Sequence, residues 1–160
     1  MRFTSTAILA VGLLASSALR AEEEQACMQV QSSIVTSFIA CPANFPSPVG
    51  LCTQGTIASG PLQGTTLFRA LSVNVSTGVY TGELVITTRD GTVIINDRGV
   101  LLPGHFVEKD VIVHGTGRFE DARGTLVSAG VVTMSGFSGT LSGRICFDGE
   151  HGGDREEERE

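Results

Sequence analysis

The stretch His114-Gly-Thr-Gly-Arg-Phe-Glu-Asp-Ala-Arg-Gly-Thr-Leu126 lies between two runs that are rich in β-branched residues. It places glycine, threonine and aspartate, which favour turns, around one large apolar residue, Phe119. A corner of this composition suits a small antiparallel barrel, because the chain must turn sharply there while its strands keep their register. The stretch therefore predicts an all-β fold in which Phe119 anchors a corner.

On both sides of this corner the sequence alternates in the manner of β-strands and shows no sustained helical period. Turn residues separate the runs at Ser76-Thr77-Gly78, Arg89-Asp90-Gly91, Pro103-Gly104-His105 and Ser135-Gly136. We expect eight strands, at Met28–Ile39, Thr53–Ser59, Thr65–Val75, Val79–Thr88, Thr92–Leu102, Phe106–His114, Gly124–Met134 and Phe137–Phe147.

Eight strands with short connections fit either a sandwich or a closed barrel. Closure removes the sheet edges that long apolar strands such as Thr92–Leu102 would otherwise expose. Glycines within the strands provide the kinks that a closed sheet requires, namely Gly55, Gly82, Gly99, Gly130, Gly139 and Gly143. We therefore predict one domain over residues 22–147, an eight-stranded antiparallel β-barrel, with a sandwich as the alternative.

The two ends of the chain differ from this middle part. Met1-Arg2, an apolar run at residues 7–15 and the small residues that follow predict a signal peptide over residues 1–21. A membrane anchor is the alternative, but the run is shorter than the ~20 apolar residues of a spanning helix. We expect a secreted or periplasmic protein without a membrane span. Residues 148–160 form an acidic tail, which we expect to be disordered.

The formal charge of −6 is concentrated at these ends. Residues 1–24 carry −1, the tail carries −5, and the segment between them is neutral. No basic stripe of the kind that binds nucleic acids is present, so we expect no nucleic-acid partner.

Four cysteines, in a compartment that permits oxidation, predict two disulfides. We favour Cys41–Cys52, which closes a loop rich in proline and glycine, and this leaves Cys27–Cys146; the other pairings remain formally possible. A zinc site is the competing interpretation. It is disfavoured because no Cys-x-x-Cys pair occurs and the three histidines are scattered. We expect no metal and no cofactor.

Asp97 is the first candidate for chemistry, because period two puts it on the strand face of Val93 and Ile95. If that face lines the lumen, burial raises the pKa of Asp97 and suits it to general acid or base catalysis. Its neighbours Asn96 and Arg98 are equally polar on the other face, so the opposite orientation stays open.

Glu108 and Asp110 share one face of the next strand, and Val107, Val111 and Val113 occupy the other. Because unpaired acids are rarely buried, we expect the valines to face the core and both acids to face solvent. In the alternative orientation the two acids are candidate ligand contacts beside Asp97. We interpret Tyr80 first as barrel packing, and as a further candidate ligand contact if it lines the lumen.

Several of these segments resemble a known superfamily. They are Thr81-Gly-Glu-Leu-Val-Ile-Thr-Thr-Arg-Asp-Gly-Thr-Val-Ile-Ile-Asn-Asp-Arg-Gly-Val-Leu101, Glu108-Lys-Asp-Val-Ile-Val113, Gly115-Thr-Gly-Arg-Phe-Glu-Asp-Ala-Arg-Gly124 and Phe137-Ser-Gly-Thr-Leu-Ser-Gly-Arg-Ile-Cys146. Together they resemble bacterial secreted proteins of the allene oxide cyclase barrel-like group, and the corner also resembles plant dirigent proteins. The resemblance covers about half of the chain, and the corner motif is its most specific part.

The resemblance implies an eight-stranded barrel whose lumen holds an apolar small molecule. Relatives cyclise an unstable epoxide or steer radical coupling, and many assemble as dimers or trimers, so a homo-oligomer is possible. The sequence contains no nucleophile elbow, phosphate loop or zinc-protease motif.

We therefore expect a disulfide-stapled barrel that binds or shields an apolar small molecule, and we leave open whether it is an enzyme. The alternatives are an allene oxide cyclase-like or dirigent-like isomerase or cyclase that uses a lumen carboxylate such as Asp97, and an interaction module with an acidic tail.

Overall fold

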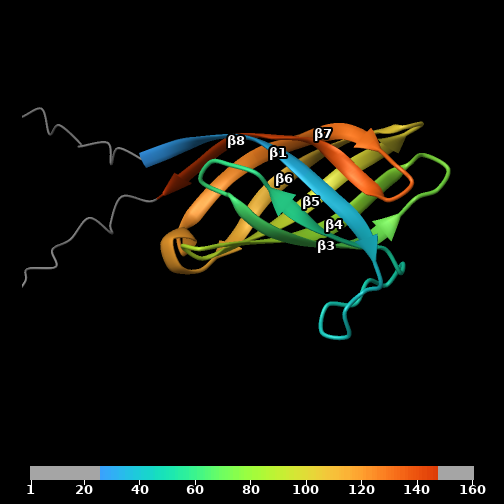
Figure 1. Cartoon of the computed structure of the whole chain (residues 1–160), viewed down its shortest axis with the longest axis horizontal. Coiled ribbons are helices and arrows are strands. Elements are labelled where there is room, and N and C mark those ends of the chain that lie inside the picture. The colour runs from blue at the N-terminus through green and yellow to red at the C-terminus, as the bar shows by residue number, and fades with distance from the viewer. Residues whose placement is uncertain (1–25, 148–160) are drawn as a thin grey trace, which may run out of the picture.

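The computed structural model describes residues 26–147, which form a closed barrel of eight antiparallel strands (Figure 1). Each strand pairs with the next along the chain, and the last pairs with the first to close the barrel. The strands are β1 (Ala26–Ile39), β2 (Cys52–Ile57), β3 (Gly64–Val73), β4 (Val79–Thr88), β5 (Thr92–Leu102), β6 (His105–Gly115), β7 (Ala122–Val132) and β8 (Gly136–Phe147).

The predicted barrel is confirmed, and the sandwich alternative is wrong. Each predicted strand overlaps an observed one, because turn residues mark every strand boundary in the sequence. The predicted signal peptide at residues 1–21 and the predicted acidic tail at residues 148–160 lie outside the described residues.

The up-and-down order of the strands gives the barrel two distinct ends. The loop at residues 40–51 and the turns β3–β4, β5–β6 and β7–β8 lie at one end, which we call the open end. The turns β2–β3 and β4–β5 and the corner between β6 and β7 lie at the other, which we call the closed end. Figure 1 shows the loop that follows β1 and the corner at opposite ends.

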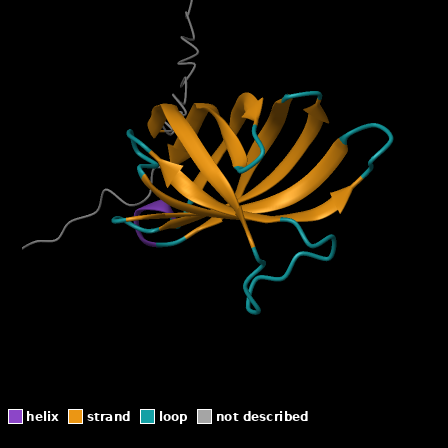
Figure 2. Cartoon of the chain, turned by 45° about the vertical axis from the view of Figure 1, so that its right-hand side comes forward, coloured by secondary structure: helices purple, strands orange, loops and turns teal. Residues whose placement is uncertain are grey.

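The corner begins with a short 3-10 helix, η1 (Gly117–Phe119), drawn in purple in Figure 2. It is attached to the β4–β5 turn, because the backbone N–H of Arg118 donates to the carbonyl of Asp90 at 2.9 Å. Phe119 is 1% exposed, and its ring centroid lies 6.4 Å from that of Phe147. The predicted anchoring role of Phe119 is confirmed, since its ring plugs the closed end of the barrel.

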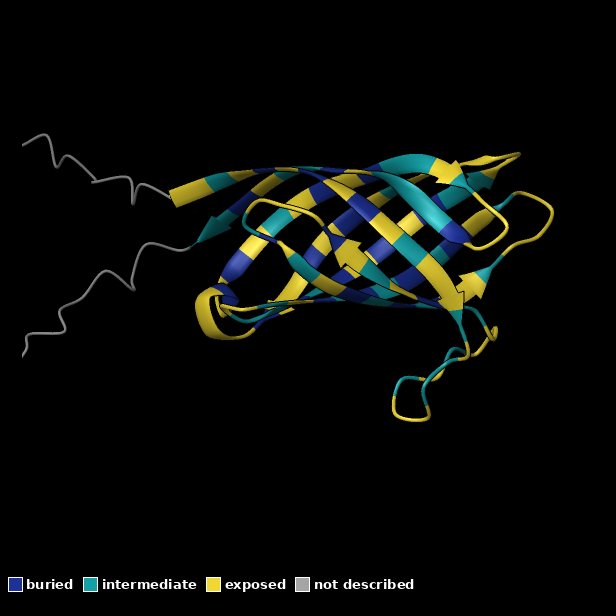
Figure 3. Cartoon of the chain, in the orientation of Figure 1, coloured by how far each residue is buried: buried dark blue, intermediate teal, exposed yellow. Residues whose placement is uncertain are grey.

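Buried and exposed residues alternate along the strands, as Figure 3 shows, so the inward side chains fill much of the lumen. The part of the lumen toward the closed end is packed with fully buried aliphatic residues, which include Ile57, Leu62, Ile86, Val93, Leu126 and Ile145. This closed half of the lumen is a hydrophobic core, and it leaves only the open half to hold a ligand.

Both predicted disulfides are confirmed. Cys27–Cys146 joins β1 to β8 at a position where the two residues are directly opposite each other, and Cys41–Cys52 ties the loop at residues 40–51 to the start of β2. Paired cysteines of this kind are typical of secreted or periplasmic proteins. In the part of the chain that the structure describes, no helix is long and apolar enough to cross a membrane.

The predicted orientation of β6 is wrong. Val107, Val111 and Val113 are between 37% and 49% exposed on the outer surface, whereas Asp110 is fully buried in the lumen. The reason is the register of the β5–β6 hairpin, which places Asp110 directly opposite Asp97. Paired residues on neighbouring strands share a face, so the inward orientation of Asp97 requires that of Asp110.

Candidate functional site

The open half of the lumen contains a cavity that is partly open to solvent. Its walls are mostly aliphatic and aromatic, and its polar side chains are few. The lining residues are Ile34, Thr36, Leu51, Phe68, Ala70, Val73, Tyr80, Leu84, Asp97, Leu101, Phe106, Glu108 and Phe137. An apolar pocket with a few convergent polar groups is the usual form of a small-molecule site.

Three acidic side chains meet beside this cavity, two of them in its lining, and we call them the acid cluster: Asp97 on β5, and Glu108 and Asp110 on β6. One carboxylate oxygen from each residue lies within 4.8 Å of the others. Asp97 and Asp110 are opposite each other in the hairpin register, and Glu108 lies two residues earlier on the same face as Asp110. The cluster is therefore a direct consequence of strand pairing.

Gly99 allows Tyr80 to join the cluster. Tyr80 on β4 and Glu108 on β6 are both paired with Gly99 on β5, from opposite sides. A Cβ atom at Gly99 would lie 2.6 Å from the Tyr80 ring and 2.8 Å from the Cβ of Glu108, which is too close for either contact. Because no side chain stands between them, the Tyr80 hydroxyl donates a hydrogen bond to Oε2 of Glu108.

The other acids of the cluster have fewer partners. The Ser128 hydroxyl donates to Oδ2 of Asp110 at 2.5 Å. Oδ1 of Asp110 and both carboxyl oxygens of Asp97 are buried and accept no hydrogen bond from any described residue. A buried carboxylate without donors is strongly unfavourable. A proton on Asp97 would relieve this, because the neutral acid can donate to Asp110.

The electrostatic environment of the cluster favours protonated acids. Burial raises the pKa of Asp97 well above its ordinary value, and the nearby charges of Glu108 and Asp110 raise it further. Burial and Asp110 raise the pKa of Glu108 to about 8, although the hydrogen bond from Tyr80 opposes this shift. Burial raises the pKa of Asp110 to about 6, and the hydrogen bond from Ser128 acts in the opposite direction.

The pKa of the Tyr80 hydroxyl is also raised, by burial first and then by the charge of Glu108. Tyr80 therefore remains a hydrogen-bond donor at neutral pH. At that pH the cluster combines protonated and ionised carboxyl groups and titrates as one coupled system.

Two kinds of chemistry are open to such a cluster. Its neutral acids can donate hydrogen bonds or protons to a ligand in a site from which water is largely excluded. Its ionised carboxylates can instead hold a cation, and the spacing of the three acids is compatible with one metal ion. Calcium takes six to eight oxygen ligands, and the hydroxyls of Tyr80 and Ser128, which hydrogen-bond to Glu108 and Asp110, are further oxygen atoms at the cluster.

The structure brings together all four candidate residues that the sequence singled out. Asp97, Glu108 and Tyr80 line the cavity, and Asp110 lies behind them. The turn at Pro103-Gly104 could have revealed the cluster, because it fixes the pairs Gly99 with Glu108 and Asp97 with Asp110. Ser128 was not predicted. Ser128 lies on β7, and the pairing of β7 with β6 depends on the irregular corner between them. The sequence spacing across that corner does not show which residues of the two strands pair.

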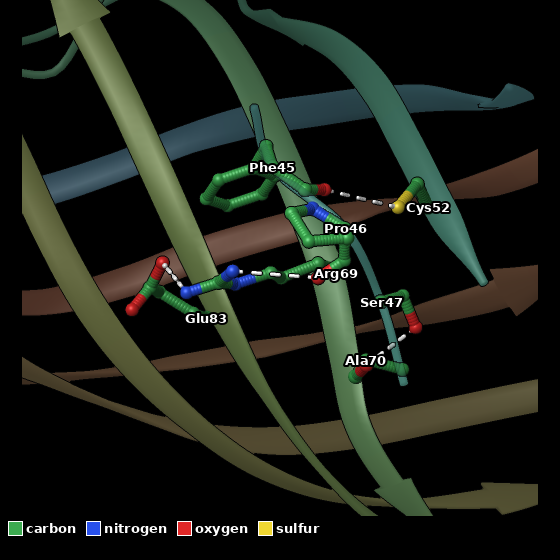
Figure 4. A network of polar contacts seen from close by, with 7 residues as sticks. All are labelled: Phe45, Pro46, Ser47, Cys52, Arg69, Ala70 and Glu83. Atoms are coloured by element: carbon green, nitrogen blue, oxygen red, sulfur yellow. Dashed lines mark hydrogen bonds and ion pairs between the residues drawn. The ribbon is translucent and has the colours of Figure 1, made fainter. Parts of the chain in front are cut away.

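Polar contacts tie the loop at residues 40–51 to β3 (Figure 4). Arg69 of β3 donates to the Pro46 carbonyl at 3.3 Å and forms an ion pair with Glu83 at 3.0 Å. The Ser47 hydroxyl donates to a β3 carbonyl at 2.6 Å. Since Leu51 of this loop lines the cavity, these contacts and the Cys41–Cys52 disulfide hold one side of the mouth in place.

The chain matches no protein-family model, and no curated protein is significantly similar to it. A function must therefore be inferred from the lumen itself, since a barrel alone is compatible with many activities.

Proposed function

We propose that this protein binds a mostly apolar small molecule in the open half of its lumen, with the polar end of the ligand against the acid cluster. The observation that carries the proposal is Asp97, which is 3% exposed, lines a mostly apolar cavity, and receives no hydrogen bond at either oxygen from the described residues. A ligand that supplies donors at this point would satisfy these atoms while its apolar part covers the walls.

The proposal includes secretion through the segment at residues 1–21 and kinship with the allene oxide cyclase barrel-like group. The corner motif at residues 115–124 supports the kinship, and so does the closed eight-stranded barrel, which other families also adopt. The two disulfides support an extracytoplasmic location.

A pair of matched variants tests ligand binding. Val73 lines the cavity, whereas Val75 is 93% exposed in the adjoining turn at the same end of the barrel. We expect Nile red, a neutral apolar dye, to bind the unmodified protein and the Val75→Trp variant with enhanced fluorescence. Val73→Trp fills the cavity and should abolish the enhancement. Equal binding by both variants, or no binding by the unmodified protein, would contradict the proposal.

A second candidate function is acid-catalysed isomerisation or cyclisation of the bound molecule. The observation that favours it is the Tyr80–Glu108 pair, which places a carboxyl group with a pKa of about 8 beside an apolar cavity. Such a group is protonated at neutral pH and can act as a general acid. We expect Glu108→Gln to slow the rearrangement of an acid-labile vinyl epoxide by about a hundredfold or more. Unchanged turnover in this variant would remove the catalytic role.

A further inference from the structure

The ionisable groups around the cavity are all acidic. Of the described residues that line it, none is lysine, arginine or histidine, and its ionisable side chains are Tyr80, Asp97 and Glu108. Asp110 lies within 4.8 Å of both carboxylates and adds to the same field. None of these lining residues carries a positive charge that could pair with an anionic ligand such as a fatty acid. The acidic lumen therefore disfavours the binding of an anion. A cationic ligand would be attracted.

The unsatisfied atoms in the lumen are acceptors that require donors. Both oxygens of Asp97 and one oxygen of Asp110 are buried without a hydrogen-bond partner among the described residues. The positive charge of an ammonium group in the lumen would lower the pKa of Asp97 and favour its ionised form. An ionised carboxylate can only accept hydrogen bonds, and a primary ammonium group carries three N–H donors and no acceptor. Charge-assisted hydrogen bonds between these two groups are among the stronger ones in proteins.

Aromatic rings surround the same space. Phe68 and Tyr80 lie edge to face with ring centroids 6.4 Å apart, and Phe106 and Phe137 do so at 5.3 Å. All four rings line the cavity. Their faces attract a cation within about 6 Å of the ring centroid, while their area favours an apolar body on the same molecule. The carboxylates and rings together suit an ammonium group that is attached to hydrocarbon.

A metal ion fits this environment less well than an organic cation. A bound calcium ion would have carboxylates on one side and hydrocarbon on the other, where it requires further oxygen ligands. A molecule with a single positive charge needs fewer oxygen contacts, and its apolar part occupies the remaining volume.

We propose that the ligand of this lumen is a lipophilic amine, whose protonated primary ammonium group lies against Asp97 and Glu108 and whose apolar chain or ring extends along the aromatic walls. This inference rests on the proposed function and narrows it to one class of ligand.

The test compares three probes of equal chain length: octylamine, octanol and octanoate. Binding is measured by calorimetry at neutral pH and by the intrinsic fluorescence of Tyr80, which is the only tyrosine in a chain without tryptophan. We expect octylamine to bind at least about tenfold more tightly than octanol, and octanoate to bind most weakly. Asp97→Asn should reduce octylamine binding to the level of octanol.

Asp90→Asn is the matched control, because Asp90 lies in the β4–β5 turn at the closed end. It removes the same charge and should leave the preference for the amine intact. Circular dichroism checks that each variant is folded, and Glu108→Gln provides a second variant of the site if Asp97→Asn is not.

The outcomes separate this inference from the proposed function. Equal binding of octylamine and octanol would overturn the amine assignment and leave lumen binding intact, whereas no binding of any probe would overturn both. A preference for octylamine that survives Asp97→Asn and Glu108→Gln would show that the amine binds elsewhere. Binding of calcium or manganese alone that is lost with Asp97→Asn would make the cluster a metal site and overturn the amine assignment.

Discussion

The two halves of the lumen are built on the same strands but have opposite characters. Toward the closed end, Phe119 and a set of buried aliphatic side chains fill the space. Toward the open end, inward positions carry three acids and a cavity. Burial of apolar surface stabilises the first half, whereas burial of poorly paired carboxyl groups destabilises the second. The difference indicates that the closed half supports the fold and that the open half is kept for a ligand.

Each end also has its own disulfide, and removing the one at the closed end should give the largest loss in the free energy of unfolding. Cys27–Cys146 joins residues 119 positions apart, and Cys41–Cys52 joins residues 11 apart. Replacing both members of the longer link by serine should lower the free energy of unfolding by about 5 kcal/mol, against about 3 kcal/mol for the shorter link. Urea denaturation of the two double variants measures this difference. A larger loss from the Cys41–Cys52 pair would contradict the expected order.

Replacing one phenylalanine in each half of the lumen by alanine should lower the free energy of unfolding by the next largest amount. Phe119→Ala removes a fully buried plug and should lower the free energy of unfolding by about 4 kcal/mol. Phe137 borders a cavity that already exists and is only partly buried, so Phe137→Ala should have about half that effect. Thermal and chemical denaturation provide the measurement. Equal losses would mean that the open half is packed as tightly as the closed half.

Replacing a buried acid by its amide should instead raise the free energy of unfolding. Asp97→Asn removes a carboxyl group whose ionisation is unfavourable in the lumen, so it should raise the free energy of unfolding by about 1–3 kcal/mol at about pH 8. Asp90→Asn, in the turn at the closed end, is the comparison variant and should change it little. Destabilisation by Asp97→Asn would show that this carboxylate is better paired than its surroundings indicate.

The same acids should make stability depend on pH. The pKa of Glu108 is raised to about 8 in the folded state, from an ordinary value of 4.5. The folded protein therefore binds more protons than the unfolded chain between these values, and stability decreases as pH rises through that interval. Unfolding measured from about pH 5 to about pH 9 should show this decrease, with a smaller slope in Glu108→Gln. An unchanged slope in the variant would assign the dependence to other groups.

Most of the fold could be predicted from the sequence, because its signals are local. Turn residues mark the strand ends, and Gly115 and Phe119 identify the corner. The orientation of β6 could not be predicted from composition, because the rule that valines are buried and acids exposed fails for Val111 and Asp110. A functional site is where such a rule is expected to fail, and there the hairpin register is the more reliable guide.

The candidate site was predicted as separate residues rather than as a cluster. Asp97 could be placed on the face of Val93 from its period alone. The bond between Tyr80 and Glu108 could not, because it passes across a third strand and depends on the missing side chain at Gly99. A contact between strands that are not neighbours produces no periodic pattern in the sequence.

The most direct test of this account is an NMR titration of the side-chain carboxyl groups in the unmodified, oxidised protein. An acid cluster that lies buried beside an apolar cavity predicts a glutamate resonance that titrates at about pH 8 and is lost in Glu108→Gln, together with aspartate resonances that titrate above their ordinary range. Titration of every carboxyl group near about pH 4 would place the three acids in water and contradict the account.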